Sequence, residues 1–277
     1  MKPLLEIRNL TKFYSKNDKL PAVCDISLVI NKNSSLALIG ESGCGKTTLA
    51  KIIMGLEKPT KGEVVFNGSN IAKMKESQLR PLRRDVQMIF QYSKSVFNPS
   101  YTVGDSIREV LLAHEKLSHE ECQRRLDEIF EVVKLPNSFQ KKYVSQLSGG
   151  QCQRANIARS LILKPKLLIC DEPVASLDYA IRHRVLELLQ EIRQTTDVTY
   201  LLITHDLSNV KDLCQNVAIM YKGNIVELAK VETDLDRVVK HPYSIDLFNS
   251  IPCADPRKRS FINEPTREYE SGGETLE

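Results

Sequence analysis

The residues best suited to chemistry lie at 36–48, where an apolar run leads into a glycine-rich segment that ends in Lys46 and Thr47. The spacing from Gly40 to Thr47 is the phosphate-binding loop pattern Gly-x-x-x-x-Gly-Lys-Ser/Thr. Glycines let successive backbone N–H groups point inward as an anion nest, and a helix starting near Lys46 adds its positive N-terminal end. Lys46 can reach the β- and γ-phosphates of a nucleotide, and the Thr47 hydroxyl can ligate Mg²⁺. A simple glycine-rich turn is the alternative, but the apolar strand before it and the apolar helix after it favour the phosphate loop.

A second apolar run, at 167–170, ends in the paired carboxylates Asp171 and Glu172. A continuous apolar run of this length is typical of a buried parallel strand, and the carboxyl ends of such strands border the ligand crevice of an α/β sheet. We expect Asp171 to hold Mg²⁺ there and Glu172 to polarise the attacking water. Two surface acids after a strand are the alternative, which the phosphate loop in the same chain disfavours.

Three weaker signals point to the same chemistry. Residues 148–150, Ser-Gly-Gly, stand just ahead of a helix predicted over 153–163, and a helix N-terminus with flexible backbone can bind an anion. His205 follows the predicted strand 199–203 and is placed to reach the crevice, although a lone histidine is usually structural. Tyr14 offers a flat face on which a base can stack, although a single aromatic residue is more often packing.

The elements that carry these residues follow from the spacing of apolar residues and from turn signals. Alternation and apolar runs predict strands at 4–8, 26–30, 36–39, 62–68, 86–90, 166–173, 199–203, 217–221 and 225–228. Hairpin turns are predicted at Asn67-Gly68 and, between the last two strands, at Lys222-Gly223-Asn224. Helical periodicity predicts helices after the phosphate loop and at 103–114, 122–133, 153–163, 180–194 and 232–250. Residues 92–165 therefore form an α-helical insertion between two strands of the core.

Composition excludes several classes of protein. The chain has 277 residues and a formal net charge of +4, which is too slight for a dedicated nucleic-acid surface. No apolar run approaches the roughly 20 residues of a membrane span, and the N-terminus lacks a signal-peptide core, so we expect the chain to stay in the cytosol. The seven cysteines include no Cys-x-x-Cys pair, which disfavours a disulfide framework or a zinc site.

The segment Leu147–Gln151, with a phosphate loop before it and Asp171-Glu172 after it, resembles the signature of ABC transporter nucleotide-binding subunits. The resemblance extends to about Pro252. The segments 40–46, 90–91 with 97–99, and His241-Pro242-Tyr243-Ser244 are similar to the peptide/nickel importer branch of that family. This resemblance implies an α/β fold. It would have a P-loop NTPase core with a mainly parallel sheet, an N-terminal antiparallel β subdomain and the helical subdomain at about 92–165. The cassette would occupy 1–252, with a C-terminal family segment at about 232–252, and the polar tail 253–277 is expected to be disordered.

The resemblance also implies a role for each matching residue. Tyr14 would stack on adenine, and the phosphates would be held by Gly40, Glu41, Ser42, Gly43, Cys44, Gly45, Lys46 and Thr47, with Thr48 close by. Thr47, Gln91 and Asp171 would meet Mg²⁺, and Gln91 would also touch the water and report nucleotide state to the membrane subunits. Glu172 would act as catalytic base or orient the water, and His205 would hold the γ-phosphate. Ser148, Gly149, Gly150 and Gln151 would bind the γ-phosphate of ATP on a partner cassette, and Asp178 would bridge the two cassettes.

A transport ATPase of this kind needs partners. The resemblance implies a second ABC ATPase subunit, with a paralogue favoured over a copy of this chain, two transmembrane permease subunits and, indirectly, an extracytoplasmic solute-binding protein. The chain would lie on the cytoplasmic face of the membrane, bind no nucleic acid and energise import of a peptide, nickel or another small solute.

Three other functions are alternatives to transport. ABC ATPases that act on ribosomes or DNA usually carry two cassettes or a long coiled-coil insertion, whereas this chain has one phosphate loop and a modest insertion. In a P-loop kinase or GTPase the 147–151 segment would have no role, and Thr204–Asp206 is not a guanine-specific motif. A purely regulatory nucleotide-binding module is the alternative that is not an enzyme. Measurable steady-state hydrolysis of ATP would exclude it.

Overall fold

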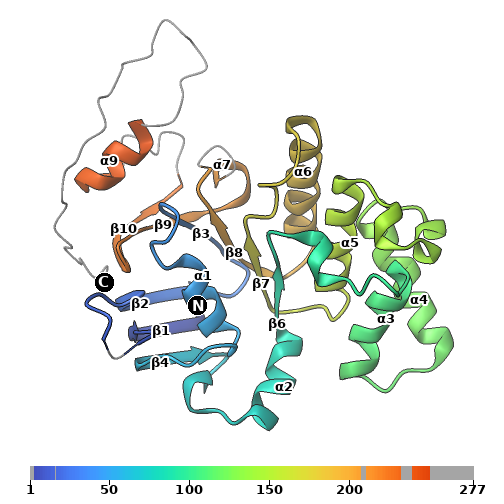
Figure 1. Cartoon of the computed structure of the whole chain (residues 1–277), viewed down its shortest axis with the longest axis horizontal. Coiled ribbons are helices and arrows are strands. Elements are labelled where there is room, and N and C mark those ends of the chain that lie inside the picture. The colour runs from blue at the N-terminus through green and yellow to red at the C-terminus, as the bar shows by residue number, and fades with distance from the viewer. Residues whose placement is uncertain (1–2, 16, 207–209, 232–238, 250–277) are drawn as a thin grey trace, which may run out of the picture. The chain divides into compact units, whose positions relative to one another are not determined.

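The computed structural model describes residues 3–15, 17–206, 210–231 and 239–249. These residues fall into two compact units. The helical unit comprises Asn31–Ser34 and Lys73–Leu202, and the P-loop unit comprises Pro3–Ile30, Ser35–Ala72 and the described residues from Ile203 onward. Figure 1 labels the elements of both.

The P-loop unit contains the N-terminal sheet. Its strands are β1 (Pro3–Lys12), β2 (Val23–Asn31), β4 (Lys61–Phe66) and β5 (Ser69–Asn70), in the order β2-β1-β4-β5. β1 pairs antiparallel with β4, and β4 with β5. The predicted turn between β4 and β5 is confirmed, since Asn67 and Gly68 both have positive φ, as a tight hairpin requires.

The same unit holds the strand and helix on either side of the phosphate loop. β3 (Ser35–Ile39) is buried at every position and leads into α1 (Lys46–Ile53). β3 is parallel to β9 (Asn216–Tyr221), which forms the predicted hairpin with β10 (Asn224–Lys230). Further helices among the described residues of this unit are α7 (Val210–Leu213) and α9 (Pro242–Asn249). Of the helix predicted over 232–250, residues 232–238 and 250 lie outside the described residues, as does the tail 253–277.

The helical unit holds the parallel pair β6 (Val86–Ile89) and β7 (Leu167–Asp171), and most of β8 (Thr199–Thr204), in the order β8-β7-β6. Its helices are α2 (Glu76–Asp85), α3 (Val103–His114), α4 (His119–Val132), α5 (Gly149–Leu161) and α6 (Tyr179–Thr195). Short 3₁₀ turns lie at Ile71–Lys73, Ser93–Val96, Asn137–Lys141 and Val144–Gln146.

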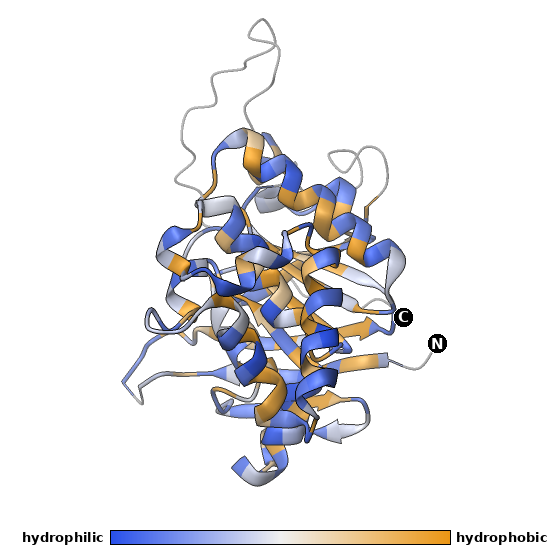
Figure 2. Ribbon diagram, turned by 90° about the vertical axis from the view of Figure 1, so that its right-hand side faces the viewer, coloured by the Kyte–Doolittle hydropathy of each residue, from blue (hydrophilic) through white to orange (hydrophobic). Residues whose placement is uncertain are grey.

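Helix α4 illustrates why these segments fold as they do. Its buried residues Cys122, Leu126, Ile129 and Phe130 recur at helical spacing and form one apolar face. The Ser118 side chain caps its first turn by accepting from the Glu121 N–H at 3.2 Å. Figure 2 shows the corresponding alternation of apolar and polar residues along the helices, with apolar residues concentrated in the strands. Among the residues that the structure describes, no helix is long and apolar enough to span a bilayer.

Candidate functional site

The phosphate loop requires glycine at defined positions. Gly45 has φ +110°, and a Cβ there would lie 2.1 Å from the carbonyl oxygen of Ala22. Gly43 has φ +82°, a backbone conformation that residues with a side chain rarely adopt. Glu41, Ser42 and Gly43 are exposed, so the curled segment is open to a ligand.

Lys46 lies inside this loop. Its side chain is buried, with 7% of the residue exposed, and Nζ donates to the carbonyl oxygens of Gly40 at 2.6 Å and Glu41 at 2.7 Å. A buried ammonium needs acceptors, and these two carbonyls supply them. Helix α1 begins at Lys46 and has no acidic residue in its first turn, so its positive end adds to the same charge. An anion with several oxygens fits this loop.

Cys44 belongs to the packing of the loop. Burial raises the pKa of its thiol, despite the nearby Lys46 ammonium, so the thiol stays protonated at neutral pH. Its carbonyl oxygen accepts from the Gly223 N–H at 3.0 Å, which ties the loop to the β9–β10 turn.

Tyr14 is 59% exposed, and a residue that serves as a stacking platform must be exposed. Its hydroxyl lies 3.0 Å from Thr48 Oγ1 and donates to Glu57 Oε1 at 3.2 Å. The Nζ of Lys12 lies 5.2 Å from the ring centroid and 3.9 Å from Glu57 Oε2. Thr48 on α1 and Glu57 therefore fix the tyrosine beside the phosphate loop. The sequence contained no signal for Glu57.

In the helical unit, Asp171 is the last residue of β7 and is 8% exposed. Glu172 follows with φ +48°, which is unusual for a residue with a side chain. Such backbone strain costs about 1–3 kcal/mol and concentrates at functional sites. Gln91 is half-buried just after β6, whose strand is parallel to β7, so the carboxyl ends of both strands carry predicted site residues.

The helix after Leu147 begins earlier than predicted. It starts at Gly149, not at residue 153, with Ser148 as its N-cap. Ser148 Oγ accepts from the Gln151 N–H at 3.4 Å, and Gln151 Oε1 accepts from the Ser148 N–H at 3.0 Å. This capping box offsets the poor helix propensity of two glycines, which misled the sequence prediction. The N-terminal end of α5 is thereby fixed and carries the predicted anion-binding residues.

The N-terminal ends of α5 and α6 pack closely together at Gly150. A Cβ at Gly150 would lie 2.3 Å from Ile181 Cγ2, whereas one at Gly149 would be 3.5 Å from Leu177 Cδ2. Asp178 caps α6 by accepting from the Ile181 N–H at 3.1 Å. Gly150 therefore has a packing role in addition to its predicted role toward a phosphate.

Replacing Gly150 by Ala should lower the free energy of unfolding by about 1–3 kcal/mol, because Ile181 must move to make room for the new methyl group. The matched control is Gly149→Ala, which adds the same methyl in ordinary contact and should stay within about 1 kcal/mol of wild type. Urea unfolding without nucleotide measures both. Equal stability of the two variants would contradict this account.

His205 is exposed directly after β8 in the P-loop unit. The turn at this point is held by the Asp206 N–H, which donates to Thr204 Oγ1 at 3.0 Å. The predicted site residues are thus divided between the two units. Within the P-loop unit the structure brings Tyr14 next to Thr48, and Lys46 next to the start of its loop. Within the helical unit it brings the signature segment next to α6.

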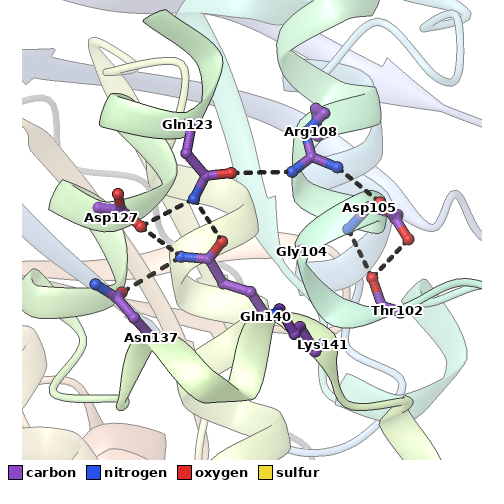
Figure 3. Close-up of a pocket in the computed structure, with 9 residues that line it drawn as sticks. All are labelled: Thr102, Gly104, Asp105, Arg108, Gln123, Asp127, Asn137, Gln140 and Lys141. Atoms are coloured by element: carbon purple, nitrogen blue, oxygen red, sulfur yellow. Dashed lines mark hydrogen bonds and ion pairs between the residues drawn. The ribbon is translucent and has the colours of Figure 1, made fainter. Parts of the chain in front are cut away.

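A pocket of about 410 Å³ lies elsewhere in the helical unit, and its lining includes none of the predicted site residues. Figure 3 shows that its polar side chains point toward one another. Asp127 Oδ1 accepts from Gln123 Nε2 at 3.0 Å and from Gln140 Nε2 at 2.8 Å, and Arg108 donates to Gln123 Oε1 at 3.3 Å. This network joins α3, α4 and the 3₁₀ turn Asn137–Lys141. We interpret it as structural.

A family model described as ABC transporter matches residues 23–175. The chain belongs to the ABC transporter family. It is 37% identical over 265 residues to the oligopeptide transport ATP-binding protein OppF of Haemophilus influenzae, covering 92% of this chain and 80% of that protein. Over 281 residues it is 38% identical to OppF of Bacillus subtilis, covering 99% and 92%.

Among solved structures, this ABC cassette resembles the ATP-binding cassette MJ0796, a dimer in a post-hydrolysis state bound to ADP and Pi. The TM-score is 0.74 at 27% identity, with 82% of this chain and 99% of that chain covered. The predicted α/β P-loop fold is therefore confirmed. The predicted family is confirmed, and so is its peptide importer branch. The prediction of an ABC-type ATPase is confirmed as well. The roles of individual residues stay predictions.

Proposed function

We propose that this ABC ATPase energises the import of peptides through a separate membrane permease. Its curated relatives named above are oligopeptide transport ATP-binding proteins by name, and the chain covers most of their length. The buried Lys46 ammonium, held by the carbonyls of its own loop, is the observation that carries the nucleotide-binding part of the proposal. A triphosphate can replace those carbonyls as acceptor.

The residues of the P-loop unit would bind the nucleotide. Loop residues 40–47 surround the phosphates with N–H groups and the Lys46 ammonium, and Thr48 lies against Tyr14, whose exposed ring stacks on the adenine. His205 would donate to the γ-phosphate.

Mg²⁺ suits the residue types predicted to hold it. The Thr47 hydroxyl, the Gln91 amide oxygen and the Asp171 carboxylate would hold it together with the phosphates, because hard oxygen ligands are the kind that Mg²⁺ prefers. The part of the chain that the structure describes has no cluster of three His, Cys, Asp or Glu side chains that could hold a metal ion. The bound ion would offset charge on the phosphate oxygens.

In catalysis, Glu172 would accept a hydrogen bond from the attacking water and orient it, while Gln91 would hold the same water from the neighbouring strand end. Lys46 and His205 would stabilise the charge that develops on the transferred group.

A second cassette would complete the site. The cassette MJ0796 is dimeric by its description, and we propose the same arrangement here, with a paralogue as the partner. The α5 N-terminus with Ser148, Gly149, Gly150 and Gln151 would then bind the γ-phosphate on the partner. Asp178, at the neighbouring end of α6, would bridge the two cassettes. The chain would sit on the cytoplasmic face of the membrane, docked on two permease subunits that receive cargo from an extracytoplasmic binding protein.

Measurements of solute uptake in cells test whether the transported substrate is a peptide. Deleting the gene should abolish uptake of a radiolabelled oligopeptide mixture, and the wild-type chain should restore it, whereas a Lys46→Ala chain should not. Nickel uptake, measured in the same strains, should be unchanged. Normal peptide uptake with lost nickel uptake would favour the nickel class that the sequence left open.

A further inference from the structure

We propose that Tyr243 is a positioning residue for nucleotide binding, acting through the first peptide group of the phosphate loop. The proposal rests on the nucleotide-binding role of that loop. It gives a function to the segment His241-Pro242-Tyr243-Ser244, which belongs to the P-loop unit but lies 202 residues from the loop residue it contacts.

The Tyr243 hydroxyl accepts a hydrogen bond from the backbone N–H of Glu41 at 3.2 Å. That N–H and the carbonyl of Gly40 belong to one peptide group, and the carbonyl accepts from Lys46 Nζ at 2.6 Å. The first peptide group of the loop is thus held at both ends, by Tyr243 at its N–H and by Lys46 at its oxygen. Hydrogen bonds linked in this way polarise one another.

The position of the Tyr243 side chain is fixed by burial and by a contact with another aromatic ring. The residue is 3% exposed, and its ring centroid lies 4.3 Å from that of Tyr221 at an interplanar angle of 36°. Burial raises the pKa of the Tyr243 hydroxyl, so the group stays neutral and protonated at physiological pH. Tyr221 ends β9, the strand parallel to β3, and β3 leads into the loop.

The backbone before α9 is fixed by a carboxylate. Glu227 on β10 accepts from the Lys240 N–H at 2.5 Å and from the His241 N–H at 3.3 Å. His241 Nδ1 accepts from the Tyr243 N–H at 3.2 Å, and Pro242 is the first residue of the helix. These contacts set where the tyrosine hydroxyl lies relative to the loop.

The consequence for binding is preorganisation. With the Glu41 N–H bound to Tyr243, the first peptide group of the loop keeps one orientation, also when a triphosphate replaces the Gly40 carbonyl as the acceptor of Lys46 Nζ. Without the hydroxyl, this N–H loses its acceptor and the loop gains freedom that the nucleotide must then remove. Binding should weaken, although the chain still folds.

The variant Tyr243→Phe tests this because it removes only the hydroxyl and keeps the ring against Tyr221. The expected result is roughly three- to tenfold weaker ATP binding in EDTA, with a similar rise in KM and kcat within twofold of wild type. The matched control is Tyr200→Phe. Tyr200 is also 3% exposed and donates from its hydroxyl to the Leu189 carbonyl at 3.5 Å, in the helical unit. This control should leave ATP affinity unchanged.

Thermal unfolding without nucleotide separates positioning from simple stability. A positioning role predicts that Tyr243→Phe and Tyr200→Phe shift Tm by similar amounts while only the first weakens ATP binding. Wild-type ATP affinity in Tyr243→Phe would overturn the proposal, with or without a drop in Tm. Failure of the wild-type chain to bind ATP would contradict the proposed nucleotide-binding function itself, and the positioning role of Tyr243 would be overturned together with it.

Discussion

Replacing Glu172 by Gln lowers the rate of ATP hydrolysis by a factor of about 10² to 10⁴, because the amide is a far weaker proton acceptor than the carboxylate and orients the attacking water less well. ATP binding is expected to persist, since the role proposed for Glu172 is in the reaction and the residue lies outside the phosphate loop. Steady-state phosphate release and binding of ATP to the purified chain measure the two effects. With its usual partner cassette present, ATP should be trapped in a closed dimer that is visible by gel filtration.

The matched control for this prediction is Glu187→Gln on α6, which makes the same change of charge on an exposed side chain paired with His183 at 3.3 Å. An exposed pair of this kind contributes little, so activity should stay at the wild-type level. Wild-type hydrolysis by Glu172→Gln would show that Glu172 has been assigned the wrong role. The positive φ of Glu172 would then need another explanation.

Replacing Lys46 by Ala weakens ATP binding by roughly 10²-fold and abolishes measurable hydrolysis, since charge-assisted hydrogen bonds to the phosphates are lost. Lys46 is the cation that the loop encloses, with two carbonyl acceptors in the structure. Isothermal titration with ATP and Mg²⁺ measures the affinity directly.

Lys32→Ala is the control for lost positive charge, because Lys32 is exposed in the turn between β2 and β3. Its ATP affinity should match that of the wild type. Equal affinity in Lys46→Ala and wild type would mean that the nucleotide is bound elsewhere, and the assignment of residues 40–47 would be withdrawn.

Local signals in the sequence were enough for many elements. The helix predicted over 103–114 is α3 with the same bounds, and Thr102 caps it by accepting from the Asp105 N–H at 3.1 Å. The turn at Lys222-Gly223 was predicted from residue type, and both residues have positive φ. Such features depend on neighbours within a few residues, so periodicity and turn chemistry are sufficient to predict them.

The start of α5 was predicted wrongly for a physical reason. Glycine at 149 and 150 disfavours a helix in isolation, yet the Ser148–Gln151 capping box begins the helix there, and the missing side chain of Gly150 lets α5 approach Ile181 on α6. Tertiary packing outweighed intrinsic propensity at this point.

The sequence by itself determined the family and the P-loop fold, and it predicted which residues would hold a nucleotide, because phosphate binding needs particular residue types at fixed short spacings. Only the tertiary structure decided what holds those residues in place. Glu57 fixes Tyr14 from 43 positions away, and Tyr243 holds the Glu41 N–H from 202 positions away. Contacts across such separations depend on how the whole chain folds back on itself, and no local pattern of residues encodes them.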